Sequence, residues 1–206
     1  MANSPGRHIG NSGRPVRISA SSTSSAWMVN SNNVIFEFVS NGWILRPGAA
    51  QDIAACTDGS AWAIGINPVP RGFGIFRWDG STWNTMPGGA VRIAACSRDD
   101  AVVVNDQGRV FEFDPSSGSW TPLPGGTGTA RDVAIGRGGT IGKSDPHGTI
   151  SFFSRERHQW ADIDSPHLLH PPLSRFRLIE VAIGPNELPW IVDTDGSTYE
   201  RTALAP

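Results

Sequence analysis

The phrase Asp52-Ile53-Ala54-Ala55-Cys56 returns forty residues later as Arg92-Ile93-Ala94-Ala95-Cys96. Looser copies begin at Arg17, Asp132 and Glu180, and every copy has a charged or polar residue before a β-branched one. A fixed period of this length predicts a repeat protein, in which each unit buries its apolar side chains only against its neighbours.

Each unit contains four short apolar segments separated by turn sequences. In the clearest unit they begin at Asp52, Ala61, Ile75 and Trp83. The segments are rich in Val, Ile, Phe and Trp, and Asp-Gly, Gly-Gly, Asn-Asn or Pro-Gly pairs lie between them, which predicts strands and hairpins. No stretch repeats its apolar residues with a helical period over enough residues to predict a helix, so we expect an all-β chain.

The length of the unit predicts the architecture. Four strands in about forty residues are typical of a propeller blade, and propellers have about four to eight blades. We therefore expect residues 1–206 to form a single domain, a five-bladed β-propeller of four-stranded antiparallel blades. The expected blades cover residues 16–50, 51–90, 91–129, 130–176 and 177–206.

The fifth unit lacks an outer strand that begins with Trp. The segment 6–13, which contains Arg7-His8-Ile9-Gly10, lies at the right spacing before the first unit to supply that strand. Closure by this N-terminal strand would leave no unpaired edge between the first and last blades.

Composition and charge argue against several classes of partner. The net charge is −2, with sixteen arginines and the single lysine Lys143, so nothing favours nucleic acid or an anionic membrane. The start of the chain has no signal-peptide pattern, and no apolar stretch has membrane-spanning length. We expect a cytoplasmic protein or leaderless export, without membrane insertion. Cys56 and Cys96 occupy one slot in adjacent blades, about 10 Å apart, so free thiols are expected.

Three phrases of the second unit together resemble the tectonin repeat. They are Asp58-Gly59-Ser60-Ala61-Trp62, Gly74-Ile75-Phe76-Arg77-Trp78 and Trp83-Asn84-Thr85-Met86-Pro87-Gly88-Gly89. The resemblance covers most of the chain. It implies a lectin similar to tectonins and tachylectins, which recognise carbohydrate at repeated sites, commonly between blades. Such repeats also serve as interaction platforms, and tectonins are often six-bladed, so six blades is the alternative.

Two insertions interrupt the repeat and suggest where a ligand binds. They cover Gly65–Gly74 and Ser165–Arg177, and the alternation of strands places both on one face of the propeller. Functional residues concentrate on loops that a rigid scaffold positions. The candidates for contacts with sugar hydroxyls or a sugar ring are Asn67, Arg71, Phe73, His167 and His170. The alternative is that both insertions are tolerated linkers.

The eight tryptophans fall into three groups. Trp43, Trp83, Trp120 and Trp160 share one slot at the start of the outer strand, which indicates packing between blades. Trp27, Trp62 and Trp190 lie on the second strand, with Val102 and Ile141 in the equivalent positions. Trp78 stands alone beside the Asp79-Gly80 turn. The candidate ligand contacts are Trp27, Trp62, Trp78, Trp190 and Asp79, and core packing is the alternative for the rings.

Other chemistries fail their sequence tests. Gly136–Ser144 resembles a phosphate-binding loop, but Arg137 stands where the first Gly of the motif belongs. His147, His158, His167 and His170 lack accompanying carboxylates for a metal site. The Asp-Gly pairs are contiguous, unlike the Asp box of sialidase-like propellers. We expect no cofactor, no metal and no catalysis.

The sequence thus predicts a non-catalytic lectin that recognises surface glycans through repeated sites between blades, with repetition raising avidity. A protein-interaction platform within a larger secretion or toxin system is the main alternative. A propeller glycosidase is a weaker one.

Overall fold

The computed structural model describes residues 13–22, 25–39, 42–124, 130–147, 149–162, 178–184, 187–193 and 198–200. Every regular element within these ranges is a β-strand, and every strand pairing is antiparallel. The all-β prediction is confirmed. Within the same residues, no helix has the length and apolar character needed to cross a membrane.

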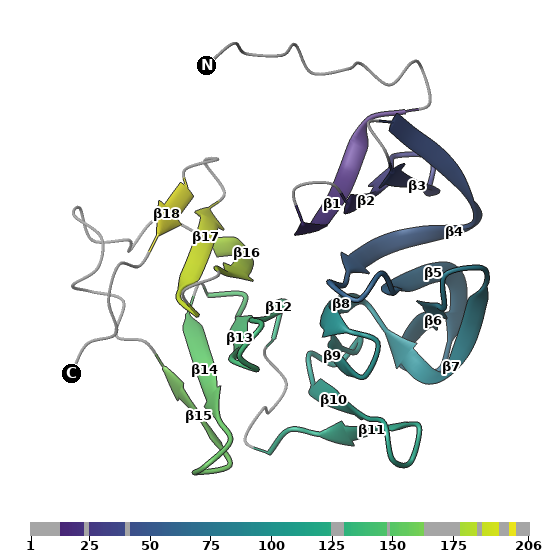
Figure 1. The fold of residues 1–206 in the computed structure, drawn as a ribbon. Helices are drawn as coiled ribbons and strands as arrows, with labels where there is room; N and C mark the ends of the chain where they lie inside the picture. The colour runs from purple at the N-terminus through teal and green to yellow at the C-terminus, as the bar shows by residue number, and fades with distance from the viewer. Residues whose placement is uncertain are drawn as a thin grey trace.

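The strands form four sheets (Figure 1). The seven-stranded sheet consists of β1 (Pro15–Ser22), β2 (Ser25–Asn30), β3 (Val34–Val39), β4 (Gly42–Ala55), β5 (Ala61–Val69), β6 (Gly72–Trp78) and β7 (Trp83–Ala90). The next sheet consists of β8 (Arg92–Ser97), β9 (Asp100–Val104), β10 (Val110–Asp114) and β11 (Ser119–Pro122). The last two sheets consist of β12 (Asp132–Ile135), β13 (Ile141–Ser144), β14 (Ile150–Ser154) and β15 (Gln159–Asp162), and of β16 (Leu178–Ile183), β17 (Pro189–Asp193) and β18 (Thr198–Glu200).

The long strand β4 belongs to two successive repeats. Its residues 42–49 pair with β3, and residues 50–55 pair with β5. The described strands therefore fall into units that match the sequence repeat. Unit one is β1–β3 with residues 42–49, unit two is residues 50–55 with β5–β7, unit three is β8–β11, unit four is β12–β15, and unit five is β16–β18.

The innermost strand of each unit faces a common centre. Strand β4 contacts β1 and β8, and β12 contacts β8 and β16, which arranges the sheets around a curve (Figure 1). Side chains on a strand alternate between the two faces of the sheet. The sheets of units two, three and four have a neighbour on both faces, so both sets of their side chains are apolar, as the runs of Val, Ile and Ala require.

Apolar cores lie between successive units. Trp27 and Ile35 of unit one pack with Ala63 and Trp78 of unit two. Trp62 of unit two belongs to the next core, which it shares with residues of unit three. The third core joins Val102 of unit three to Phe153 of unit four.

Trp83 and Trp120 pack between units, as the sequence predicts for their slot. The Trp83 indole Nε1 donates a hydrogen bond to the Pro47 carbonyl, at 2.9 Å, and Trp120 donates to the Pro87 carbonyl at the same distance. Each bond joins the outer strand of one unit to the preceding unit. Cys56 and Cys96 are free thiols, as expected.

Two sequence expectations need correction. The insertion Gly65–Gly74 does not form a loop of that length, because β5 and β6 extend through it to a turn at Pro70 and Arg71. Gly72 is required there, since a Cβ on it would lie 2.6 Å from the Ala90 carbonyl oxygen.

The second correction concerns the strand register in unit four. Ala54 pairs with Trp62, and the corresponding Ala134 pairs with Gly142. Gly142, not Ile141, therefore occupies the tryptophan slot. The insertion Ser165–Arg177 and the closing segment around Arg7-His8-Ile9-Gly10 lie outside the described residues.

Candidate functional site

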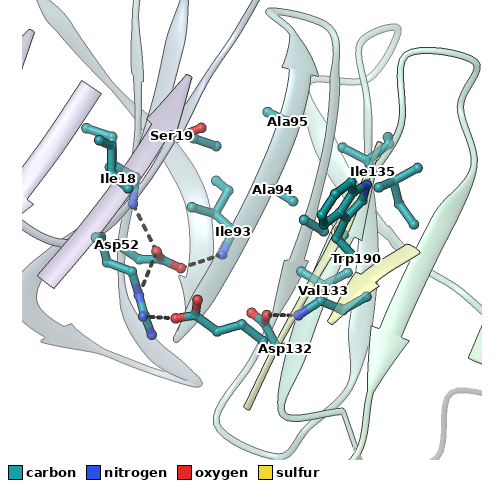
Figure 2. Close-up of a pocket in the computed structure, with 18 of the residues that line it drawn as sticks. Ile18, Ser19, Asp52, Ile93, Ala94, Ala95, Asp132, Val133, Ile135 and Trp190 are labelled. Atoms are coloured by element: carbon teal, nitrogen blue, oxygen red, sulfur yellow. Dashed lines mark hydrogen bonds and ion pairs between the residues drawn. The ribbon is translucent and has the colours of Figure 1, made fainter. Parts of the chain in front are cut away.

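The first candidate is a central cavity of about 430 Å³. Figure 2 shows it bounded by the innermost strands. Residues from all five copies of the repeated phrase line its wall. The wall is largely alanine and β-branched side chains, including Ala94, Ala95 and Val133. Trp190 of β17 also lines it and is 44% exposed.

One end of the cavity carries a charged belt, formed by the residue that precedes the β-branched position in each copy: Arg17, Asp52, Arg92, Asp132 and Glu180. Arg17 forms ion pairs with Asp52, at 3.4 Å, and with Glu180. Arg92 forms one with Asp132 at 3.8 Å. Ion pairs thus join units one and two, three and four, and five and one.

Carboxylates of the belt complete the remaining junctions. Asp52 Oδ2 accepts a hydrogen bond from the Ile93 amide at 3.0 Å, and Asp132 Oδ2 accepts one from the Val181 amide at 3.0 Å (Figure 2). These bonds join units two and three and units four and five. The belt therefore connects all five innermost strands.

Burial controls the protonation of the belt. Loss of water around Asp132 raises the pKa of its carboxyl group to about 6, although the Val181 amide opposes the change. Burial also raises the pKa of Asp52, against the attraction of Arg92 and Arg17. Because these carboxylates are already paired with protein groups, the belt acts mainly as a connection between units.

The second candidate is a cleft of about 250 Å³ between units one and two. Its wall combines apolar side chains, aromatic rings and one amide: Ile35, Gly48, Ala49, Ala63, Gly65, Ile66, Asn67, Phe76 and Trp83. The Trp83 ring is half-buried, and its bond to Pro47 fixes its orientation. A Cβ on Gly65 would lie 2.7 Å from Phe76, so the glycine leaves room for the Phe76 ring against the strand.

Asn67 is exposed at the cleft, and no hydrogen bond to its side chain is present among the described residues. An amide beside an aromatic ring in a preformed cleft offers both a directional hydrogen bond and a flat apolar surface. Asn67 was predicted from the sequence because it lies in an insertion. Trp83 was predicted only as a packing residue, because a position repeated in four units does not reveal that the ring is partly exposed.

Three of the predicted ligand contacts are core residues. Trp27, Trp62 and Trp78 are exposed by 1%, 0% and 3%. Trp27 makes edge-on contacts with Trp78, and Trp62 does so with Phe113. With every face covered by protein, these rings offer no surface for a sugar, and the core-packing alternative fits them.

The other predicted residues are spread over different places. Arg71 is exposed in the β5–β6 turn with φ +73°, and Phe73 is half-buried against the core. Asp79 is exposed, but its carboxylate accepts hydrogen bonds from the Thr82 and Ser81 amides and from neighbouring side chains, which lower its pKa. Only Asn67 of this set lines the cleft.

His167 and His170 lie outside the described residues. Within the described ranges, no group of three or more His, Cys, Asp or Glu side chains is placed to hold a metal ion. The glycine-rich turn Gly136–Thr140 holds a protein carboxylate, because Glu187 accepts hydrogen bonds from the Gly138 and Thr140 amides.

Solved structures of other proteins share the fold. The WD40 β-propeller domain of Doa1 is 12% identical, with a TM-score of 0.68 over 93% of this chain and 64% of that chain. YCF48 from Cyanidioschyzon merolae is 15% identical, with a TM-score of 0.65 over 97% of this chain and 70% of its own. YCF48 bound to D1 peptide is also 15% identical, with a TM-score of 0.62 over 94% of this chain and 67% of that one. At these identities the similarity establishes the propeller fold alone.

No curated protein sequence is similar enough to be matched. The Tectonin domain family, however, matches residues 15–205. This range includes every described strand, and the match confirms the resemblance in the repeated phrases. The chain therefore belongs to the tectonin domain family.

Proposed function

We propose that the protein is a five-bladed β-propeller lectin that binds glycans, without catalysis, in clefts between neighbouring blades. The five units would be the blades, with the N-terminal segment 6–13 supplying the outer strand of the fifth. The charged belt supports five blades, because it connects unit five back to unit one. A six-bladed ring would require a further sheet between Arg17 and Glu180.

The cleft between units one and two carries the proposal. A pyranose ring has hydroxyl groups around its edge and patches of C–H on its faces. The half-buried Trp83 ring provides a flat surface for a C–H patch, and Asn67 provides both a donor and an acceptor for hydroxyls. Because Pro47 holds Trp83 in place, little ordering of the ring is needed on binding.

Each site is expected to be weak, and avidity on a surface with many sugars would supply useful strength. The junction between units two and three repeats the Trp-to-Pro bond, through Trp120 and Pro87, but lacks the extended hairpin that brings Asn67 into the first cleft. We therefore propose fewer working sites than blades. The carboxylates of Asp79 and of the belt already accept hydrogen bonds from protein groups, which supports a non-catalytic role.

A glycan array followed by calorimetry tests the proposal. We expect binding of a defined sugar, competition by the free monosaccharide, and at least a tenfold loss of affinity in Asn67→Ala, in line with about 1.4 kcal/mol for a lost hydrogen-bonding group. Gln107→Ala is the matched control, since Gln107 is an exposed amide in a turn of unit three. A folded protein that binds no glycan, or binds equally well after Asn67→Ala, would contradict the cleft.

A protein-interaction platform is the second candidate function. YCF48, which has the same fold, is described in a complex with D1 peptide. Unit one also exposes large apolar side chains at Val16, Val39 and Ile44. If the protein binds no glycan on the array and retains a stable partner in pull-down experiments, this alternative is favoured.

A further inference from the structure

The first three junctions between units contain the same pair of aromatic rings. The later unit provides a pair of rings, one from its third strand and one from its fourth. The centroids are 5.3 Å apart in each of the pairs Trp78–Trp83, Phe113–Trp120 and Phe153–Trp160. The pair lies on the sheet face that looks toward the preceding unit.

The preceding unit can provide a third ring, from its second strand. Trp27 lies 5.7 Å from Trp78 and 5.6 Å from Trp83. Trp62 likewise lies 5.1 Å from Phe113 and 5.7 Å from Trp120. A second-strand tryptophan thus packs against the ring pair of the following unit.

Unit one has the ring pair, but among the described residues no third ring packs on it. Phe38 and Trp43 are 5.5 Å apart at an interplanar angle of 65°, close to the geometry of the other pairs. On the same sheet face, the register places Ile18 beside Met28 and Leu45 beside Phe36. Ile18 and Leu45 are each 67% exposed. This apolar face, which we call the open face of unit one, has the composition of a buried junction.

Unit five has the opposite deficiency. Trp190 pairs with Ala182, as Trp62 pairs with Ala54, so it occupies the second-strand tryptophan slot. Among the described residues, however, no ring pair packs on Trp190, and it is 44% exposed. The last unit therefore has a ring without a pair, and the first unit has a pair without a ring.

Two contacts already bring unit one toward the end of the chain. Arg17 of β1 forms its ion pair with Glu180 of β16, and Arg137 of unit four donates a hydrogen bond to the Ser21 carbonyl of β1 at 3.2 Å. Both contacts involve β1, the innermost strand of unit one. On the open face, Met28 and Phe36 are buried, whereas Ile18 and Leu45 remain exposed. Because the ion pair makes unit five the neighbour of unit one, Trp190 is the second-strand ring that precedes the ring pair of unit one around the centre.

We infer that Trp190 packs between Phe38 and Trp43 and that this contact makes the fifth and first sheets the final junction of the ring. The partner of the open face is therefore unit five of the same chain. Trp190 is a packing residue in this conformation and does not bind ligand. The inference rests on the five-bladed ring proposed above and is independent of glycan binding.

Fluorine NMR of protein labelled with 5-fluorotryptophan tests the inference without any sugar. Trp190→Phe, Trp62→Phe and Trp27→Phe assign three resonances. A soluble paramagnetic agent then reports how exposed each ring is. We expect the Trp190 resonance to be protected to the same degree as those of Trp27 and Trp62.

A pair of substitutions tests the specific contact. Phe38→Leu should shift the Trp190 resonance and leave that of Trp62 in place. Phe113→Leu should do the reverse, because Phe113 contacts Trp62. Both variants retain an apolar side chain, and the dispersion of the remaining resonances verifies folding.

Three results would overturn the inference. The first is a Trp190 resonance broadened by the agent far more than that of Trp62. The second is a Trp190 resonance that does not respond to Phe38→Leu in a folded protein. The third is protection that appears only at concentrations where light scattering detects a dimer, because a second copy would then cover the face.

Discussion

Arg17 and Glu180 form an ion pair although they are 163 residues apart in sequence. The pair connects β1, the first described strand, with β16, the innermost strand of unit five. Arg17 also contacts Asp52 of β4. One guanidinium group therefore joins three units at one end of the central cavity, which gives it a larger structural role than Glu180.

The two partners should differ in their effect on stability. Glu180→Gln should lower the free energy of unfolding by about 0.5 kcal/mol, since exposed ion pairs contribute little. Arg17→Gln should lower it by about 1 to 2 kcal/mol, because it also removes the ion pair with the buried Asp52 carboxylate and leaves Arg92 as the remaining nearby cation. Urea denaturation of both variants measures the difference. Equal effects would show that Arg17 acts only through Glu180.

The bond between Trp83 and Pro47 can be separated from ring packing. Trp83→Phe keeps an aromatic ring but removes the donor, and should lower the free energy of unfolding by about 1 kcal/mol. Trp83→Ala should lower it by about 3 to 5 kcal/mol. Trp120→Phe provides the matched comparison, because its bond to Pro87 has the same length. If neither phenylalanine variant loses stability, the repeated bond is incidental.

Burial of Asp132 predicts a specific pH dependence. Its pKa in the folded protein is about 6, above the usual 3.8, so the folded state favours the protonated carboxyl group. The resulting stabilisation is complete below about pH 4 and is lost as the pH rises through about 6. Asp132→Asn should not show this loss, because an amide oxygen still accepts from Val181.

The measurement is thermal or urea unfolding of both proteins from pH 4 to pH 7. The free energy of unfolding of the variant should gain about 1 to 3 kcal/mol relative to the parent over this range. Loss of the Arg92 ion pair offsets part of the gain. Parallel stability curves for the two proteins would contradict the prediction.

The repeat and the positions of the strands could be predicted from the sequence, because apolar segments between turn pairs report strands directly. The role of each tryptophan could not. In stacked sheets both faces are buried, so alternation along a strand does not distinguish a core ring from a ring in a cleft. Trp27 and Trp78 meet from different units, and this contact depends on how two sheets stack rather than on spacing.

The cleft between units one and two was only partly predictable for a similar reason. The insertion Gly65–Gly74 made Asn67 a candidate ligand contact. The conformation of the insertion, however, depends on strand pairing that the residue pattern does not show. Strands β5 and β6 continue through the insertion with a register shift between Ile64 and Pro68. Asn67 lies within that irregular stretch and lines the cleft together with Trp83.

Substitution of a core residue should lower stability, whereas substitution of a cleft residue should lower glycan binding and leave stability almost unchanged. Trp62→Ala should lower the free energy of unfolding by about 3 to 5 kcal/mol, because the ring is completely buried. Asn67→Ala should change it by less than about 0.5 kcal/mol, because the side chain is exposed. Denaturation measured beside glycan binding separates the two. A Trp62→Phe variant with native stability but no glycan binding would instead return Trp62 to the binding site.

Glu187 connects units four and five at the turns between their first and second strands. Its carboxylate accepts hydrogen bonds from the Gly138 amide at 2.9 Å and the Thr140 amide at 3.3 Å. Burial opposes ionisation, but these bonds prevail and lower the pKa of Glu187. The stabilisation is therefore present above the usual pKa of 4.5 and is lost as the pH falls through the lower folded value.

The close approach of Gly136 to Glu187 permits a rescue experiment. A Cβ on Gly136 would lie 2.3 Å from Glu187 Oε2, so Gly136→Ala must displace the carboxylate. We expect Glu187→Ala to lower the free energy of unfolding by about 1 kcal/mol at neutral pH, and Gly136→Ala to lower it by at least as much. The double variant should lose less than the sum, because the clash and the bonds disappear together. Additive losses in urea denaturation would mean that the turn and the carboxylate do not meet in solution.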